Sequence, residues 1–256
     1  MSTQIATIAA YTFLEAVRNR LAWLAVAFVL VGFALAEFVG DLAITESATF
    51  ESGFLGALLR FCAVFMVALF VITSMVREFD DKVLELVLAL PVPRAHYYFG
   101  KLLGFSLLAA LTAVVFGLVL LIYVPADQVL LWVISLTCEL LIVTALSLLC
   151  LFTFAQVTLA LSAVMAFYLL ARSIDAFRLM AEYPVAAADT LSHRVIQWVI
   201  EGLAFLLPSF ERFTSSAWLV YHSGAWADLL PIAAQTLIYL TLLAGAALFD
   251  LYRKNL

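Results

Sequence analysis

The chain has 256 residues, of which 66% are hydrophobic and 12% are charged, and its formal net charge is −5. A soluble domain is about 45–50% apolar and about 25% charged, so this composition excludes an ordinary soluble domain and is typical of an integral membrane protein. The net charge indicates little about partners, because the placement of Lys and Arg matters more than their sum in a membrane protein.

Long apolar runs recur along the chain, and about 20 apolar residues are enough to cross a bilayer core about 30 Å thick. Residues 1–20 come first and are mildly amphipathic, which predicts a helix lying in the membrane interface. The first long run has the basic start and A-x-A ending of a signal peptide, but its charged region is long for that role and five more runs follow. The predicted spans are residues 21–37, 54–76, 102–123, 129–149, 152–171 and 229–249.

A charged segment that contains two prolines, residues 77–101, lies between the second and third spans. Within it, residues 78–90 place apolar side chains at helical spacing and acidic ones on the opposite face, which predicts a short amphipathic helix. Pro91 ends this helix, and Pro91-Val92-Pro93 predicts a stiff corner before the third span. An ordinary connector needs only a few polar residues, whereas a stiff corner with clustered charge suits a mechanical contact with another protein.

The basic residues predict the orientation of the chain. In a six-span arrangement one side of the membrane collects Arg18, Arg20, Arg77, Lys82, Arg94, Lys101, Arg253 and Lys254. The positive-inside rule makes this side cytoplasmic, with both termini on it. Residues 173–228 then form an external loop. Its apolar piece, residues 195–207, is too short to cross and predicts a re-entrant or interfacial helix; a loop on the lipid surface with no gating role is the alternative.

Three polar residues within predicted spans are candidates for a functional role. Glu139 lies near the middle of the fourth span, where a carboxylate costs at least a few kcal/mol and should face protein or water. It is either a polar point on a translocation path or dimer seam, or a hydrogen-bonded or protonated residue that only fixes helix packing. Arg60 either belongs to the same path or reaches outward to pair with Glu37 or Glu51. Gln156 is a third candidate for the path, unless it only bonds neighbouring helices.

The charged segment resembles the corresponding part of the permease subunits of ABC-2 type exporters. The shared pattern is a glutamate, a leucine-rich helix, L-x-x-P-x-x-R and a Gly-Lys pair that opens a span, here Glu78, Leu84, Leu86, Leu88, Leu90, Pro91, Arg94, Gly100 and Lys101. The order of parts along the whole chain is also similar. Within this family, the likeness is greatest to the branch that includes the nitrous oxide reductase maturation permease.

This resemblance implies one all-α permease domain over residues 1–256, with six transmembrane helices, an N-terminal interfacial helix, a cytoplasmic coupling helix and an external re-entrant region. Residues 77–101 would be a coupling loop that docks on a separate ATPase subunit. Its implied contact residues are Glu78, Asp81, Lys82, Glu85, Pro91, Pro93 and Arg94. The external helical region would cap the exit, with Trp198, Glu201 and Pro208 as gate residues.

The resemblance also implies the partners and the location. We expect a second copy of the chain, two copies of a cytoplasmic ATPase and membrane lipid as partners in a bacterial cytoplasmic membrane, with a periplasmic accessory protein as a further candidate. ATP and Mg²⁺ are expected on the ATPase, because this chain has no G-x-x-x-x-G-K-[ST] motif. Its three histidines and three cysteines show no metal-ligand spacing. We therefore expect no cofactor, metal ion, catalytic residue or nucleic-acid partner for the chain itself.

Two other functions compete with an exporter permease. A membrane subunit can pass the work of an ATPase to an external partner without transport, and a large external domain, which the sequence does not contain, would favour this function. A membrane-embedded enzyme would need His, Asp or Ser groups clustered at membrane depth. The sequence contains no H-E-x-x-H motif, no paired aspartates within a span and no nucleophile beside a base.

Overall fold

The computed structural model describes residues 2–19, 21–42, 47–81, 93–154, 156–182 and 191–253. Every regular element in these ranges is a helix. Six of the helices in the described part of the chain are long and apolar enough to cross a membrane. They are α2 (Leu21–Leu42), α3 (Ser47–Asp80), α5 (Arg94–Leu120), α6 (Ala126–Phe154), α7 (Val157–Glu182) and α10 (Leu229–Arg253). The prediction of an all-α membrane protein with six spans is confirmed.

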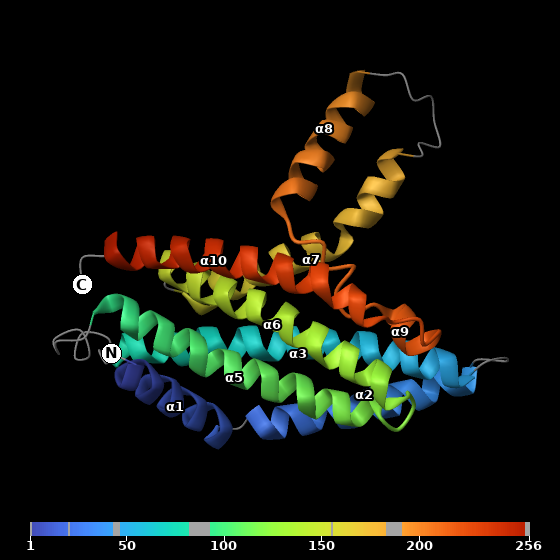
Figure 1. Ribbon diagram of the computed structural model, residues 1–256, viewed down its shortest axis with the longest axis horizontal. Coiled ribbons are helices and arrows are strands. Elements are labelled where there is room, and N and C mark those ends of the chain that lie inside the picture. The colour runs from blue at the N-terminus through green and yellow to red at the C-terminus, as the bar shows by residue number, and fades with distance from the viewer. Residues whose placement is uncertain are drawn as a thin grey trace.

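The long helices lie side by side in one elongated bundle (Figure 1). Both chain termini lie at the same end of this bundle, which is called the termini end below. The predicted interfacial helix is α1 (Ser2–Arg18), which lies obliquely along α5 at this end. The later part of α7 leaves the bundle together with α8 (Leu191–Leu206), and the two form a hairpin that projects to the side. The short helices α9 (Ser216–Val220) and η1 (Trp226–Asp228) lead into α10.

Five of these helices run past the predicted ends of their spans, and the extensions of α3 and α7 matter most for the candidate sites. α3 runs to Asp80, so Arg77 and Glu78 continue the second span instead of starting a separate amphipathic helix. α7 runs to Glu182, well past the predicted end at residue 171. α5 begins directly after Pro93, whose φ of −58° already matches a helix. The rest of the predicted amphipathic helix and the corner at Pro91 fall on residues 82–92, which lie outside the described residues.

α6 forms the centre of the bundle. It packs against α3, α5, α7 and α10, and the side chains of Trp132, Leu136 and Leu140 on it are fully buried. Buried hydroxyl groups such as that of Thr144 donate to the carbonyl oxygen one turn earlier in the same helix, at 2.7 Å in this case. This bonding satisfies a polar group where water is absent. The centre of a single copy is therefore filled with side chains.

Two glycines allow α1 to approach α5 closely. A Cβ atom built on Gly104 would lie 2.6 Å from Cβ of Thr12 and 2.8 Å from the carbonyl oxygen of Ala9. A Cβ on Gly100 would lie 2.7 Å from Cβ of Ile8. None of these atoms is the end of a flexible side chain, so the backbone would have to move. Small residues commonly permit such close packing between helices in membranes.

We predict that Gly104→Ala separates α1 from α5 and lowers stability by about 1–3 kcal/mol, because the added methyl group has no space. Gly245→Ala is the matched control, since a Cβ at Gly245 on α10 meets no atom within 4 Å. The control should change stability by no more than about 1 kcal/mol. Thermal unfolding of the purified protein in detergent measures both effects, and equal midpoints for the two variants would contradict the close packing.

Candidate functional site

Charged side chains that connect different helices gather in two places. The first is at the termini end, where α3 and α5 flank the predicted coupling loop. The second lies inside the bundle, where α3, α6 and α7 surround a turn formed by residues 210–214. Phe210, Phe213 and Thr214 of this turn are buried, whereas Glu211 and Arg212 are exposed.

At the termini end, Glu78 is held by two partners on α5. Its Oε1 forms an ion pair with Nζ of Lys101, and its Oε2 accepts a hydrogen bond of 2.6 Å from the hydroxyl of Tyr97. The side chains of Glu78 and Lys101 are only 13% and 8% exposed. A shielded carboxylate with both oxygens engaged fixes the end of α3 to α5, and removing one partner of such a pair is costly. The glutamate and lysine of the family pattern are thus in direct contact.

The other end of the predicted coupling loop is attached to α10. Arg94, the first residue of α5, donates from Nη1 to the carbonyl oxygen of Leu251 at 2.9 Å. A cation suits this position, because the last carbonyl groups of a helix carry partial negative charge. Asp81 and Pro93 are exposed at the two edges of the loop. The remaining predicted contact residues, Lys82, Glu85 and Pro91, lie outside the described residues.

Inside the bundle, Glu139 of α6 is fully buried. Its Oε2 accepts a hydrogen bond of 2.9 Å from Oγ1 of Thr214. The backbone N–H of Thr214 donates to Oγ of Ser135, one turn earlier on α6, also at 2.9 Å. Thr214 has a φ of 46°, a conformation that few residues other than glycine adopt. These two bonds hold the turn in that conformation against α6.

Two arginines bind the carbonyl oxygens of the same turn. Arg60 of α3 donates from Nη1 to the carbonyl oxygen of Thr214 at 3.0 Å. Arg172 of α7 donates to the carbonyl oxygens of Phe213, at 2.9 Å, and Phe210. Backbone carbonyl groups at membrane depth must find donors, and a guanidinium group offers five. Glu139 places a negative charge among the two positive ones.

The sequence placed Glu139 and Arg60 in one candidate group, and the structure brings both to Thr214. Arg60 does not pair with Glu37 or Glu51 in the structure. Glu37 instead accepts a hydrogen bond of 3.2 Å from the hydroxyl of Tyr123, and burial together with this bond raises the pKa of Tyr123.

The third member of that group does not join the cluster. Gln156 is exposed at the break between α6 and α7, near the termini end of α7. Sequence reasoning missed Arg172, because the fifth span was ended at residue 171 and this arginine was counted as part of a loop. It also missed Thr214. The signal available for Arg172 was the helical, still largely apolar pattern that continues through residues 172–181.

The predicted gate residues lie in and after the projecting hairpin. Trp198 is 80% exposed on α8. Glu201 and Arg178 both line a polar hollow of about 200 Å³ between α8 and α7, where Nε2 of Gln197 donates to the carbonyl oxygen of Ala181 at 3.0 Å. Pro208 is buried just after α8.

These features define a class of protein, a multi-pass helical membrane protein whose charged groups hold helices, a loop and a turn in place. The sequence matches the family model described as ABC-2 family transporter protein over residues 41–248. This match covers most of the chain, so the chain belongs to the ABC-2 family and is a membrane component of an ABC transporter. No curated protein in the comparison matches it. The likeness to the nitrous oxide reductase maturation branch stays a prediction.

We predict that Arg172→Met loosens the buried turn, because the carbonyl groups of Phe210 and Phe213 then lack their donor. Each buried polar group left unsatisfied costs about 1–3 kcal/mol. The variant should unfold at a lower temperature and be cut faster by protease within residues 207–215. Arg178→Met is the matched control, because Arg178 is an exposed arginine on the same helix. Equal cutting rates for the two variants would show that Arg172 does not hold the turn.

Proposed function

We propose that the chain is the permease subunit of an ABC-2 exporter, which couples ATP hydrolysis by a separate ATPase subunit to movement of a substrate across a bacterial cytoplasmic membrane. Membership of the ABC-2 family is the observation that carries this proposal. The six candidate spans support it, as does the charged loop fixed at both edges to the bundle.

The complex consists, in this proposal, of two copies of the chain and two copies of the ATPase, surrounded by membrane lipid. The filled centre of one copy supports pairing, because the buried side chains of α6 leave the path to form between copies. Exposed apolar residues on the projecting hairpin, among them Trp198 and Phe205, offer a surface for the second copy, for lipid or for an external accessory protein. Trp198, Glu201 and Pro208 form the external gate in this arrangement.

Residues 77–101 make the contact with the ATPase in this proposal. The exposed Asp81 and Pro93, together with Lys82, Glu85 and Pro91 between them, face the ATPase. Glu78 and Arg94 have a different role: they fix the two edges of the loop to the bundle, as their bonds to α5 and α10 support. A displacement of the loop is then passed to the helices, because both edges of the loop are bonded to the bundle.

We predict that Pro91→Ala with Pro93→Ala reduces the stimulation of ATP hydrolysis by substrate and reduces transport, while membrane yield stays near wild type. The physical reason is that a flexible corner absorbs displacement that a stiff one transmits. ATPase activity and transport are measured with the copurified complex in proteoliposomes, and its mass should correspond to two copies of each subunit. Unchanged coupling would remove this role from the loop.

Exchanging the two charges of the Glu78–Lys101 ion pair shows, in the same experiment, whether Glu78 fixes α3 to α5 or contacts the ATPase directly. Glu78→Lys should uncouple the complex, since it places two ammonium groups together in a poorly exposed position. The double variant Glu78→Lys with Lys101→Glu should restore coupling, because the ion pair forms again in reverse. A defect that the exchange fails to restore would instead assign Glu78 to the ATPase surface.

A mechanical function without transport is the alternative, and the projecting hairpin of α7 and α8 is the observation that favours it (Figure 1). A rigid arm with exposed aromatic residues suits contact with an external partner. The proteoliposome experiment distinguishes the two functions. Hydrolysis that depends on an external protein, with no substrate moved, would favour the mechanical function.

We predict that Ser47→Cys and Asn255→Cys react with an impermeant thiol reagent from opposite sides of the membrane, with Asn255 on the cytoplasmic side. The beginning of α3 lies at the end of the bundle away from the termini, which supports this topology. The three native cysteines are first replaced by alanine. Labelling of both positions from the same side would contradict an even number of spans.

A further inference from the structure

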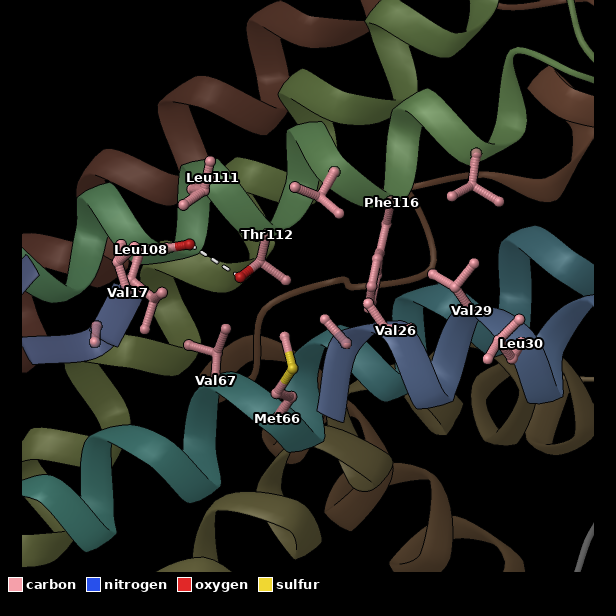
Figure 2. Close-up of a pocket in the computed structure, with 14 residues that line it drawn as sticks. Val17, Val26, Val29, Leu30, Met66, Val67, Leu108, Leu111, Thr112 and Phe116 are labelled. Atoms are coloured by element: carbon pink, nitrogen blue, oxygen red, sulfur yellow. Dashed lines mark hydrogen bonds between the residues drawn. The ribbon is translucent and has the colours of Figure 1, made fainter. Parts of the chain in front are cut away.

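An apolar cavity of about 410 Å³ opens among α1, α2, α3 and α5. Figure 2 shows Val26 of α2, Met66 of α3 and Phe116 of α5 around this space. Thr112 is the only residue with a polar side chain in its lining, and its hydroxyl donates to the carbonyl oxygen of Leu108 at 3.0 Å. A cavity that offers no free polar partner does not hold ordered water, so its lining suits hydrocarbon.

A second hollow, of about 520 Å³, lies along a neighbouring face of α1. Arg18 of α1 and Arg77 of α3 both line it, and both are exposed. Neither guanidinium group has a hydrogen-bond partner among the residues that the structure describes. Glu15 also lines this hollow, but its Oε1 accepts a hydrogen bond of 3.2 Å from Oγ of Ser74. Two guanidinium groups against one engaged carboxylate give the hollow a net positive charge.

The two spaces adjoin at the last turn of α1. Val17 lines the apolar cavity, whereas Arg18, the next residue, lines the charged hollow. On α3, Arg77 lies nearer the termini end than Val67, which lines the apolar cavity, by about 15 Å at 1.5 Å per residue. The positive hollow therefore lies nearer the termini end than the apolar cavity does. A phospholipid in one leaflet has its charged head group and its acyl chain in this order.

We propose that this site binds one anionic phospholipid, with an acyl chain in the apolar cavity and its phosphate between Arg18 and Arg77. The charge of the hollow selects an anionic head group, since basic residues near a membrane surface attract anionic lipids. An apolar helix of a second copy would fill the cavity but would leave the two arginines without an anion. The site is independent of what the protein transports.

The head-group part of the site is tested with the full chain, purified in detergent and stripped of lipid. Dioleoyl phosphatidylglycerol and dioleoyl phosphatidylcholine are added in turn, and native mass spectrometry measures the lipid retained. We expect one phosphatidylglycerol per chain, retained about thirtyfold more strongly than phosphatidylcholine. Arg18→Gln with Arg77→Gln should remove this preference. Arg253→Gln, the control, changes an exposed arginine at the same end and should leave it intact.

The cavity part is tested with Val26→Trp, which fills the space and should abolish retention of both lipids. Leu118→Trp is the control, because Leu118 is 60% exposed on α5 and lies outside the cavity lining. A second measurement uses the wild-type chain and so does not depend on the folding of a variant. Phosphatidylglycerol with a diazirine in its acyl chain should label cavity residues of α2 and α5.

Three results would overturn the proposal. The first is equal retention of the two lipids by the wild-type chain. The second is diazirine labelling confined to residues outside the cavity. The third is Val26→Trp reducing the dimer fraction while lipid retention is unchanged, which would assign the cavity to a second copy of the chain.

Discussion

The need to satisfy backbone polar groups away from water governs the inner part of this structure. Between α8 and α10 the chain leaves regular structure and passes through the turn at residues 210–214, where Phe210, Phe213 and Thr214 are fully buried. Irregular backbone is tolerated at such depth only when protein groups replace the missing hydrogen bonds. Arg60 and Arg172 donate to its carbonyl groups, and Ser135 accepts from its N–H. This requirement explains why two arginines are present inside the bundle.

The two arginines in turn account for Glu139 at a costly position. Two guanidinium groups close to one buried turn would repel each other and leave positive charge without compensation. Glu139 supplies the opposite charge and also accepts the hydrogen bond of the Thr214 hydroxyl. This arrangement favours the interpretation in which Glu139 fixes packing within one copy. A polar point on a path would need access to water or to the second copy, and the side chain is 0% exposed in the single chain.

The sequence predicted the number, order and type of the spans, because an apolar run of about 20 residues is long enough to cross a bilayer as a helix. It also predicted a helix within the apolar piece 195–207, which is part of α8. It placed the ends of α3 and α7 too early, because a charged residue that finds partners inside the protein, such as Glu78 in α3 or Arg172 in α7, does not end a helix. Arg172 illustrates the point: its donors are used within the fold, so α7 continues past it.

The contacts within the candidate sites could not be predicted from local sequence patterns. Arg60 and Thr214 are separated by 154 residues, and Glu139 and Thr214 by 75. Neither spacing corresponds to a helical repeat or a known ligand motif. Glu78 and Lys101 are separated by only 23 residues, and both belong to the family pattern. The pattern nevertheless did not indicate that their side chains are in contact. Periodicity identifies the face of one helix, whereas packing decides which faces meet.

α3 connects the two charged regions. It carries Glu78 at the termini end and Arg60 at the buried turn, about 27 Å apart at 1.5 Å per residue. The ion pair with Lys101 fixes one of these points to α5, and the bond to the Thr214 carbonyl fixes the other to the chain that follows α8. α3 is a continuous helix between these two attached points. In the proposed coupling, α3 is the direct connection between a displaced loop and the turn that follows the projecting hairpin.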